Sequence, residues 1–217
     1  MITNLSEKYS LLNDWLGELR NVEVQTDRMR FRRNLERVGE IMAYEISKVL
    51  KWQESEIQTP LGIHNNKVLT EQPVISTILR AGLPFHQGLL NYFDKADNAF
   101  ISAYRKHHRD GTFTISLEYL SCPSIEDRVL IVCDPMIATG ASLVASLHSL
   151  LRLGTPSEIH IVSAIAATVG LDYVVQEFGD KPYIWCGDID DELTAKGYIV
   201  PGLGDAGDLA YGPKSQF

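Results

Sequence analysis

Residues 129–142 carry the pattern in this sequence that points most directly to chemistry. Five apolar residues open the stretch and predict a strand buried on both faces, which ends at Asp134 and the proline after it. From Ala141 onward, apolar residues recur at spacings of three and four, which predicts a helix. The connecting loop places the hydroxyl of Thr139 and the flexible backbone of Gly140 at the start of that helix.

Such a loop has the properties of an anion-binding site. The first turn of a helix leaves backbone N–H groups unpaired and carries the positive end of the helix dipole, which together favour a phosphate. A carboxylate beside the loop would repel phosphate, so we assign Asp134 to sugar hydroxyls and expect a phosphate joined to a ribose. The alternative is an ordinary strand-to-helix turn in which Thr139 or Ser142 is a plain N-cap.

The rest of the chain supplies a repeating frame for this loop. Buried strands alternate with helices at intervals of about thirty residues, which is typical of βαβ units and predicts an α/β fold with a mainly parallel sheet flanked by helices. The expected strands begin near residues 74, 100, 129, 159 and 183, and the expected helices span residues 83–93, 142–153 and 170–178.

Ligands of such sheets bind beyond the carboxyl ends of the strands, and the residues there are polar. Arg80 follows the first expected strand and Arg105 the second, while Asp188 and Asp190 end the fifth. The fork of an arginine side chain suits phosphate oxygens, so two arginines beside a phosphate loop indicate a polyphosphate ligand.

Composition limits the class of protein. The 217 residues are 45% hydrophobic and 22% charged, as expected of one globular domain. A net charge of −8 and a pI near 5.2 argue against nucleic-acid or anionic-membrane binding. Three cysteines without a C-x-x-C pair indicate neither a disulfide framework nor a zinc cluster, and no segment reads as a leader or a membrane span. We therefore expect a cytoplasmic protein.

The N-terminal region, about residues 5–50, predicts two helices. The first spans residues 5–20, and the second begins at Thr26 as its N-cap. The second helix carries an arginine cluster at its start, formed by Arg28, Arg30, Arg32, Arg33 and Arg37. The cluster is either an effector or RNA contact, or a set of arginines that meet acidic residues of another subunit or solvent; the acidic composition favours the second interpretation.

Two further segments lie outside the βαβ pattern. Residues 57–63 predict a hairpin with a Pro/Gly turn, and Asn65–Asn66 predicts another turn. Residues 106–121 alternate in polarity like an exposed strand or hairpin, which makes this β-arm a lid or a dimer arm. His107 and His108 open it and are interpreted as loop residues in preference to a metal site.

The C-terminal segment is the second concentration of chemistry. Residues 197–208 hold glycines at 197, 202, 204 and 207, so the backbone there can approach a flat ligand closely. Backbone N–H and C=O groups match the alternating acceptors and donors along the edge of a uracil-like ring. A flexible glycine-rich tail is the alternative, although Asp205 and Asp208 are not required in a spacer.

Taken together, these motifs resemble those of uracil phosphoribosyltransferases. The resemblance runs from about residue 9 to residue 212, and its most specific pieces are residues 78–83, 104–105, 134–142 and 198–208. It implies a type I phosphoribosyltransferase-like fold with the β-arm at about 106–121 and a small uracil-binding hood at about 188–212, all within a single domain of residues 1–217.

The resemblance also implies an activity and a site. Members join N1 of uracil to C1′ of phosphoribosyl pyrophosphate (PRPP) in pyrimidine salvage, giving UMP and pyrophosphate, with Mg²⁺ held through PRPP and water rather than by a dedicated protein site. Asp205 and Arg105 are the implied catalytic residues. The implied PRPP-binding residues are Arg80, Arg105, Asp134, Pro135, Met136, Ile137, Ala138, Thr139, Gly140, Ala141, Ser142 and Asp205, and those for uracil are Ile199, Gly204, Asp205 and Ala206. A homodimer or homotetramer and a GTP effector are further implications.

Three residues depart from the family pattern. Ala141 and Pro84 replace usual glycines, and Leu209 stands where a basic residue is common. If position 141 needs a positive φ angle or a close approach to phosphate, its alanine weakens PRPP binding. Residues 106–120 also match poorly, so any part they have in catalysis is in question.

Three other functions compete with uracil salvage. The first is a regulatory protein of the same fold that senses PRPP or nucleotides and has little catalysis, although RNA binding would require a basic face that the pI disfavours. The others are a transferase for another base and a catalytically silent relative.

Overall fold

A computed structural model describes residues 1–107 and 113–214, with side chains described outside residues 104–117. Within these residues, eight strands form one sheet, and its described pairings are parallel except that of β5 with β6. The order is β1 (Ile2–Asn4), β10 (Pro182–Asp190), β9 (Glu158–Ala167), β7 (Val129–Cys133), β4 (Val74–Leu79), β5 (Asp97–His107) and β6 (Phe113–Ser121), with β8 (Met136–Ile137) beside β9. The predicted α/β fold with a mainly parallel sheet is confirmed.

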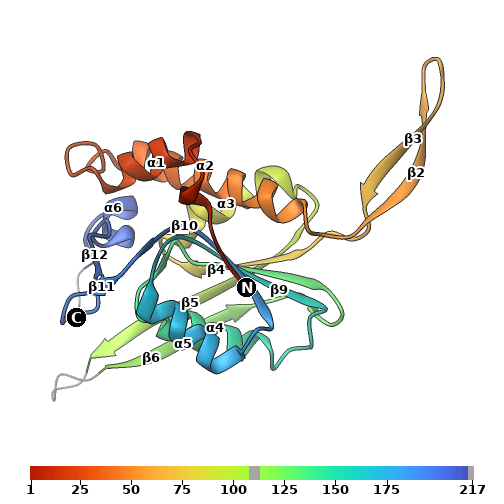
Figure 1. The fold of residues 1–217 in the computed structure, drawn as a ribbon. Coiled ribbons are helices and arrows are strands. Elements are labelled where there is room, and N and C mark those ends of the chain that lie inside the picture. The colour runs from red at the N-terminus through yellow and green to blue at the C-terminus, as the bar shows by residue number, and fades with distance from the viewer. Residues whose placement is uncertain (108–112, 215–217) are drawn as a thin grey trace.

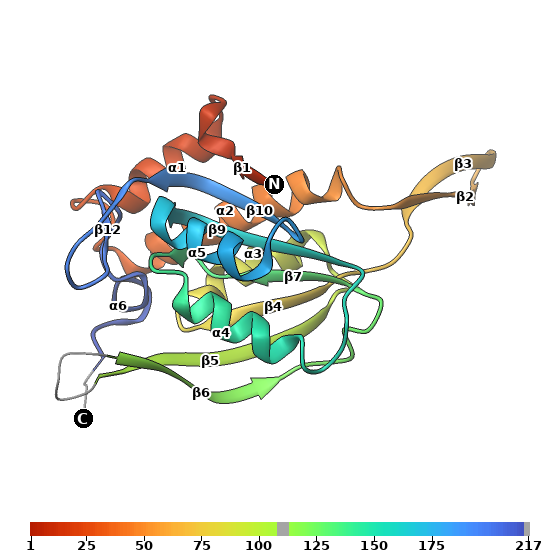
Figure 2. The same ribbon diagram turned by 60° about the horizontal axis from the view of Figure 1, so that its bottom comes forward.

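Helices cover both faces of this sheet (Figures 1 and 2). α1 (Leu11–Arg20), α2 (Arg28–Ser47) and α3 (Gly82–Tyr92) pack on one face, and α4 (Ala141–Leu150) and α5 (Thr168–Phe178) on the other. In β7, Ile131 faces the α1–α3 core while Leu130 and Val132 face the α4–α5 core. Because both faces of β7 are buried, its sequence is continuously apolar rather than alternating.

α2 and α3 cross at very short distance because two glycines lie at the crossing. A Cβ atom on Gly88 would lie 2.0 Å from the carbonyl oxygen of Glu36, and one on Gly39 would lie 2.2 Å from that of Phe85. The backbones of the two helices therefore touch directly, and this contact fixes how α2 lies over the sheet.

The N-terminal helices begin later than the sequence predicts. The helix expected over residues 5–20 is divided into a 3₁₀ turn, η1 (Leu5–Glu7), and α1, because Ser10 forms a capping box with Asn13. The N-cap of α2 is Asp27 and not Thr26, since the Asp27 carboxylate accepts the N–H of Arg30 at 3.0 Å. Residues 2–4, for which no element was predicted, pair with β10 as β1.

The predicted hairpin around residues 57–63 is present and longer than expected. β2 (Trp52–Thr59) and β3 (Gly62–Leu69) form a two-stranded ribbon that projects away from the body of the molecule (Figure 1). The turn expected at Asn65–Asn66 is wrong, because both residues lie inside β3 opposite Glu56 and Ser55. Their asparagine side chains are tolerated in a strand that is solvent-exposed on most positions.

The described parts of the predicted β-arm, residues 106–107 and 113–121, belong to the edge of the main sheet. β5 continues to His107, and β6 returns antiparallel to it with a register shift between Ser102 and Ala103. His108 lies outside the described residues. Among the described residues, no helix combines the length and apolar content that a membrane span requires.

We predict opposite effects of one methyl group at two helical glycines. Gly88→Ala should destabilise the protein by about 1–3 kcal/mol, because its Cβ would collide with the α2 backbone. Gly17→Ala in α1 is the matched control: a Cβ there meets nothing within 4 Å, so the better helix propensity should stabilise by about 1 kcal/mol. Thermal unfolding measures both, and equal melting temperatures for the two variants would contradict the close crossing.

Candidate active site

The loop between β7 and α4 closes around a small cavity at the carboxyl end of the sheet. Its volume is about 50 Å³. The lining residues are Asp134, Met136, Ile137, Ala138, Thr139, Gly140, Ser142 and Leu143. The structure thus brings together most of the residues that the sequence assigns to PRPP, with Pro135 and Ala141 in the same loop but outside the lining.

The start of α4 is suited to an anion. Its N-cap is Gly140, which adopts a φ of 76° and offers no side-chain acceptor to the first turn. Neither Thr139 nor Ser142 is the N-cap, so the alternative of a plain capped turn is wrong; the Thr139 hydroxyl only accepts a 3.4 Å contact from the N–H of Ala141. The first turn therefore keeps N–H groups that an external anion can accept from.

The cavity wall is supported from behind by α5. A Cβ on Gly170 would lie 2.3 Å from the carbonyl oxygen of Ala138, and one on Gly140 would lie 2.7 Å from the carbonyl oxygen of Gly170. The loop before α4 is therefore in direct backbone contact with α5, and the place of the loop depends on the absence of a side chain at Gly170.

Asp134 lies at the mouth of this loop. One of its carboxylate oxygens accepts the N–H of Met136 at 3.2 Å, and its own N–H donates to the carbonyl of Val162. The two hydrogen bonds fix the backbone where β7 ends, and Asp134 also lines the cavity.

Arg80 joins the sheet to the C-terminal segment. Its Nη2 donates to Oδ1 of Asp208 at 2.7 Å, and its Nη1 donates to the carbonyl of Gly212 at 3.2 Å. Arg80 follows β4, whereas Asp208 lies in α6 (Ala206–Tyr211), so motifs 128 residues apart in sequence meet at one place. This short helix was not predicted; the glycines around it suggested a continuous loop.

Asp205 is the N-cap of α6. Its Oδ1 accepts the N–H of Asp208 at 3.0 Å, and its Oδ2 accepts Nζ of Lys214 at 2.9 Å. Burial alone would raise the pKa of Asp205, but the hydrogen bonds from Lys214 and from backbone N–H groups outweigh it and lower the pKa below 3.8. Asp205 is therefore an ionised carboxylate and a weak base at neutral pH.

The loop before α6 presents backbone rather than side chains. Ile199 in β12 (Ile199–Val200) is 3% exposed and Ala206 is 5% exposed, and both pack in the core under α1–α3. β12 pairs with β11 (Glu192–Leu193) in a small separate ribbon. Gly202 and Gly204 have φ angles of 55° and 96°, which only glycine adopts readily. A flat ligand at this loop would meet main-chain N–H and C=O groups.

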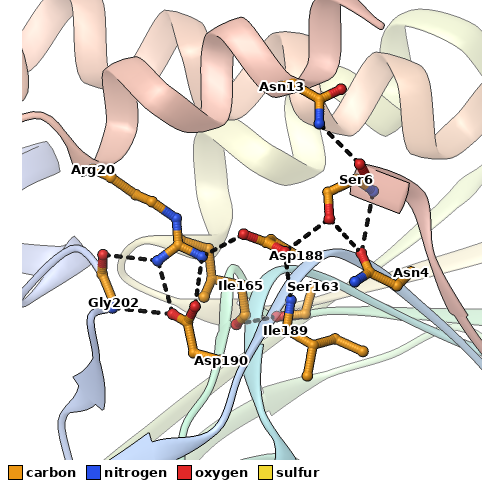
Figure 3. A network of polar contacts seen from close by, with 10 residues as sticks. All are labelled: Asn4, Ser6, Asn13, Arg20, Ser163, Ile165, Asp188, Ile189, Asp190 and Gly202. Carbon is orange, nitrogen blue, oxygen red and sulfur yellow. Dashed lines mark hydrogen bonds and ion pairs between the residues drawn. The ribbon is translucent and has the colours of Figure 1, made fainter. Parts of the chain in front are cut away.

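A polar network anchors this loop to the sheet and to α1 (Figure 3). Arg20 binds the carboxylates of Asp188 and Asp190, and Asp190 also accepts the N–H of Gly202. The two aspartates follow a predicted strand, so the sequence marks them as polar residues at its carboxyl end. Arg20 carries no such signal, because a single arginine at the end of an amphipathic helix is indistinguishable from a solvated one.

Arg105 lies on β5 beyond Ser102, but its side chain is outside the described residues. Its predicted role therefore stays a prediction. The backbone of β5 runs beside β4, which leads to Arg80, so the two positions belong to neighbouring strands.

The three departures from the family pattern have local explanations. Ala141 is the first residue of α4 and has no positive φ, so alanine fits there. Pro84 is the third residue of α3, where N–H groups lack helical partners in any case. Leu209 is half-buried against the core beneath α6.

Most of the arginine cluster on α2 has partners within the chain, whereas the sequence favoured acidic residues of another subunit or solvent. Arg30 forms two 2.7 Å bonds to Glu18, and Arg33 pairs with Glu36 at 2.7 Å. Arg32 donates to the carbonyl of Ala210 at 2.7 Å, so it links α2 to α6.

Comparison with known proteins extends over the whole of this architecture. A family model described as uracil phosphoribosyltransferase matches residues 6–213. A uracil phosphoribosyltransferase of Porphyromonas gingivalis is 51% identical over 213 residues, which cover 98% of this chain and 99% of that protein. Another, from Methanothermobacter thermautotrophicus, is 40% identical over 87% of this chain and 86% of its own. The solved structure of a protein from Aquifex aeolicus is 31% identical, with a TM-score of 0.87 and 98% of both chains covered.

We predict that Gly170→Ala weakens PRPP binding about tenfold, because the added Cβ would push the carbonyl of Ala138 and with it the cavity wall. Gly17→Ala adds the same methyl group to a helix with open space around it and is the control. Calorimetric titration with PRPP measures the change. Equal dissociation constants for Gly170→Ala and the control would mean that α5 does not support the ligand loop.

Proposed function

Because the chain belongs to the uracil phosphoribosyltransferase family, we propose that it joins N1 of uracil to C1′ of PRPP and releases pyrophosphate. The observation that carries the proposal is the ion pair of Arg80 with Asp208, since it gathers the end of β4 and the C-terminal segment into one site. The domain is a single unit of residues 1–217 in which residues 188–212 form the uracil-binding hood.

The reaction needs positioning and charge stabilisation more than a protein nucleophile. The C1′–O bond to pyrophosphate breaks as N1 of uracil attacks C1′, and the N1 proton passes to solvent water. The loop at 138–142 holds the 5′-phosphate, Asp134 the ribose hydroxyls, and Arg80 with Arg105 the negative charge that develops on pyrophosphate. For Arg80 to do so, its guanidinium must share or exchange its contact with Asp208.

Asp205 acts on uracil by orientation. Its lowered pKa makes it a poor acceptor of the N1 proton, whereas the fixed negative charge and the α6 cap orient the backbone that meets the base. Ile199, Gly204 and Ala206 complete the frame for the ring through their main chain.

Mg²⁺ is the cofactor we propose, carried by the phosphate oxygens of PRPP and water. Within the described residues, no group of three or more histidine, cysteine, aspartate or glutamate side chains is placed to hold a metal ion. The oxygens of PRPP and water suit Mg²⁺, which binds substrate phosphates and keeps several waters. When bound, the ion neutralises charge on the leaving pyrophosphate.

We also propose a homodimer or homotetramer. The β2–β3 hairpin projects from the body, its tip residue Leu61 is 100% exposed, and a lone two-stranded ribbon is marginally stable in water. A second copy of the chain is the partner we expect it to contact. Light scattering tests this with a chain in which a short Gly-Ser turn replaces residues 53–68. That chain should form particles with fewer copies than the full chain. An unchanged number of copies would show that the hairpin is not part of the interface.

Localisation and regulation complete the proposal. Cys122, Cys133 and Cys186 are free thiols, which suits the reducing cytoplasm. Cell fractionation tests that location, and recovery of the protein in an extracellular fraction would contradict it. A GTP response stays a prediction. The arginines on α2 that suggested it are largely bound to partners within the chain, which leaves fewer of them to bind a nucleotide.

The experiment that tests the function is formation of UMP from radiolabelled uracil with PRPP and Mg²⁺, beside cytosine and hypoxanthine, with and without GTP. Rapid product with uracil alone supports the salvage enzyme. No product with any base, despite measurable PRPP binding, would favour a regulatory protein of the same fold; the acidic pI near 5.2 already weighs against RNA binding.

We predict that Asp205→Asn lowers kcat by about tenfold or more. The substitution keeps the size of the side chain and removes the negative charge beside the base. The ionised form of Asp205 is lost only as pH falls through its lowered pKa. Lys214→Met removes the hydrogen bond that lowers this pKa most, so the pKa of Asp205 should rise. The acid limb of the plot of rate against pH should then move to higher pH. Full turnover by Asp205→Asn, or an acid limb unmoved in Lys214→Met, would contradict the role.

A further inference from the structure

The backbone of Gly202 is held at both of its polar groups by two side chains (Figure 3). Its N–H donates to Oδ2 of Asp190 at 3.0 Å, and its carbonyl accepts Nη1 of Arg20 at 3.0 Å. Arg20 and Asp190 also bind one another through two bonds, of 2.7 and 2.9 Å. Three residues from α1, β10 and the hood therefore form one closed set of hydrogen bonds.

The backbone conformation of Gly202 is tightly constrained. Its φ of 55° lies in the left-handed region, and a Cβ there would lie 2.2 Å from the carbonyl oxygen of Ile199. Its neighbour Leu203 is 4% exposed and packs in the core. A shift of the Arg20 or Asp190 side chain must therefore move the main chain of the loop itself.

The anchor is itself fixed on the side away from the loop. Nη2 of Arg20 donates to Asp188 at 2.7 Å, and the other oxygen of Asp188 accepts the hydroxyl of Ser6 at 2.8 Å. The side chains of Arg20 and Asp190 are 19% and 7% exposed. Charge-assisted bonds in a planar fork with this little exposure are stronger and more directional than a solvent-exposed ion pair.

We infer that Arg20 and Asp190 are positioning residues for the uracil half of the site, which they serve by setting the place of the Gly202 backbone. The inference rests on the proposed function, in which the main chain from Ile199 to Ala206 frames the base. Neither side chain contacts the phosphate loop in the described hydrogen bonds, so their loss acts on uracil binding before it acts on PRPP binding.

The chain offers a matched control at another arginine–carboxylate pair. Arg30 binds Glu18 through two 2.7 Å bonds and joins α2 to α1, the helix that also carries Arg20. Arg30→Lys breaks the same kind of fork without a bond to the hood. It therefore separates loss of a helix clamp from loss of the Gly202 anchor.

Steady-state kinetics with each substrate varied at saturating concentration of the other tests the inference. Arg20→Lys keeps the charge but cannot bind Asp190 twice and also reach the Gly202 carbonyl, and Asp190→Asn keeps one acceptor. For both we expect the KM for uracil to rise about tenfold while the KM for PRPP stays within about twofold. Arg30→Lys should leave both KM values within about twofold, and Arg20→Ala, if it folds, should exceed Arg20→Lys.

The outcomes distinguish failure of this inference from failure of the proposed function. Unchanged KM for uracil in Arg20→Lys and Asp190→Asn, or an equal rise in both KM values, overturns the positioning role alone. Ala206→Val overpacks the buried side of the hood and so displaces its main chain, and it should also raise the KM for uracil. If Ala206→Val has no effect, the assignment of the uracil site falls, and if the wild type forms no UMP, the proposed function falls.

Discussion

Parallel strands place all their carboxyl ends at one edge of a sheet, and this constraint organises the molecule. Asp134 after β7, Arg80 after β4 and Asp190 at the end of β10 come from parallel strands of one sheet, in which β7 lies next to β4 and β9 separates β7 from β10. These residues are far apart in the sequence, and the pairing of the strands is enough to bring them to one edge.

The C-terminal hood is the part that the sheet does not position by itself. It has little secondary structure of its own, only a two-residue ribbon and the six-residue helix α6. Three arginines tie it down instead: Arg20 holds Gly202, Arg80 holds Asp208, and Arg32 holds the carbonyl of Ala210. Each arginine comes from a different helix or strand end, so the hood is fixed at two residues within α6 and at one residue before it.

The sequence predicted the strands and helices well and the side-chain contacts between them poorly. A run such as residues 129–133 is apolar because both its faces are buried, so periodicity finds it. Helix starts were less certain: Asp27 rather than Thr26 caps α2, since either side chain suits the position and tertiary packing chooses. Arg20 and Gly170 escaped prediction because what marks them, a contact with Gly202 and with the Ala138 carbonyl, exists only after folding.

The most direct test of this account is a crystal structure with UMP and pyrophosphate bound. We predict the 5′-phosphate within hydrogen-bond distance of backbone N–H groups in residues 139–142, and the uracil ring against the main chain of residues 202–206. Pyrophosphate should contact Arg80, with its bond to Asp208 lengthened or shared. A nucleotide bound elsewhere, with the loop at the start of α4 free of phosphate, would contradict the account.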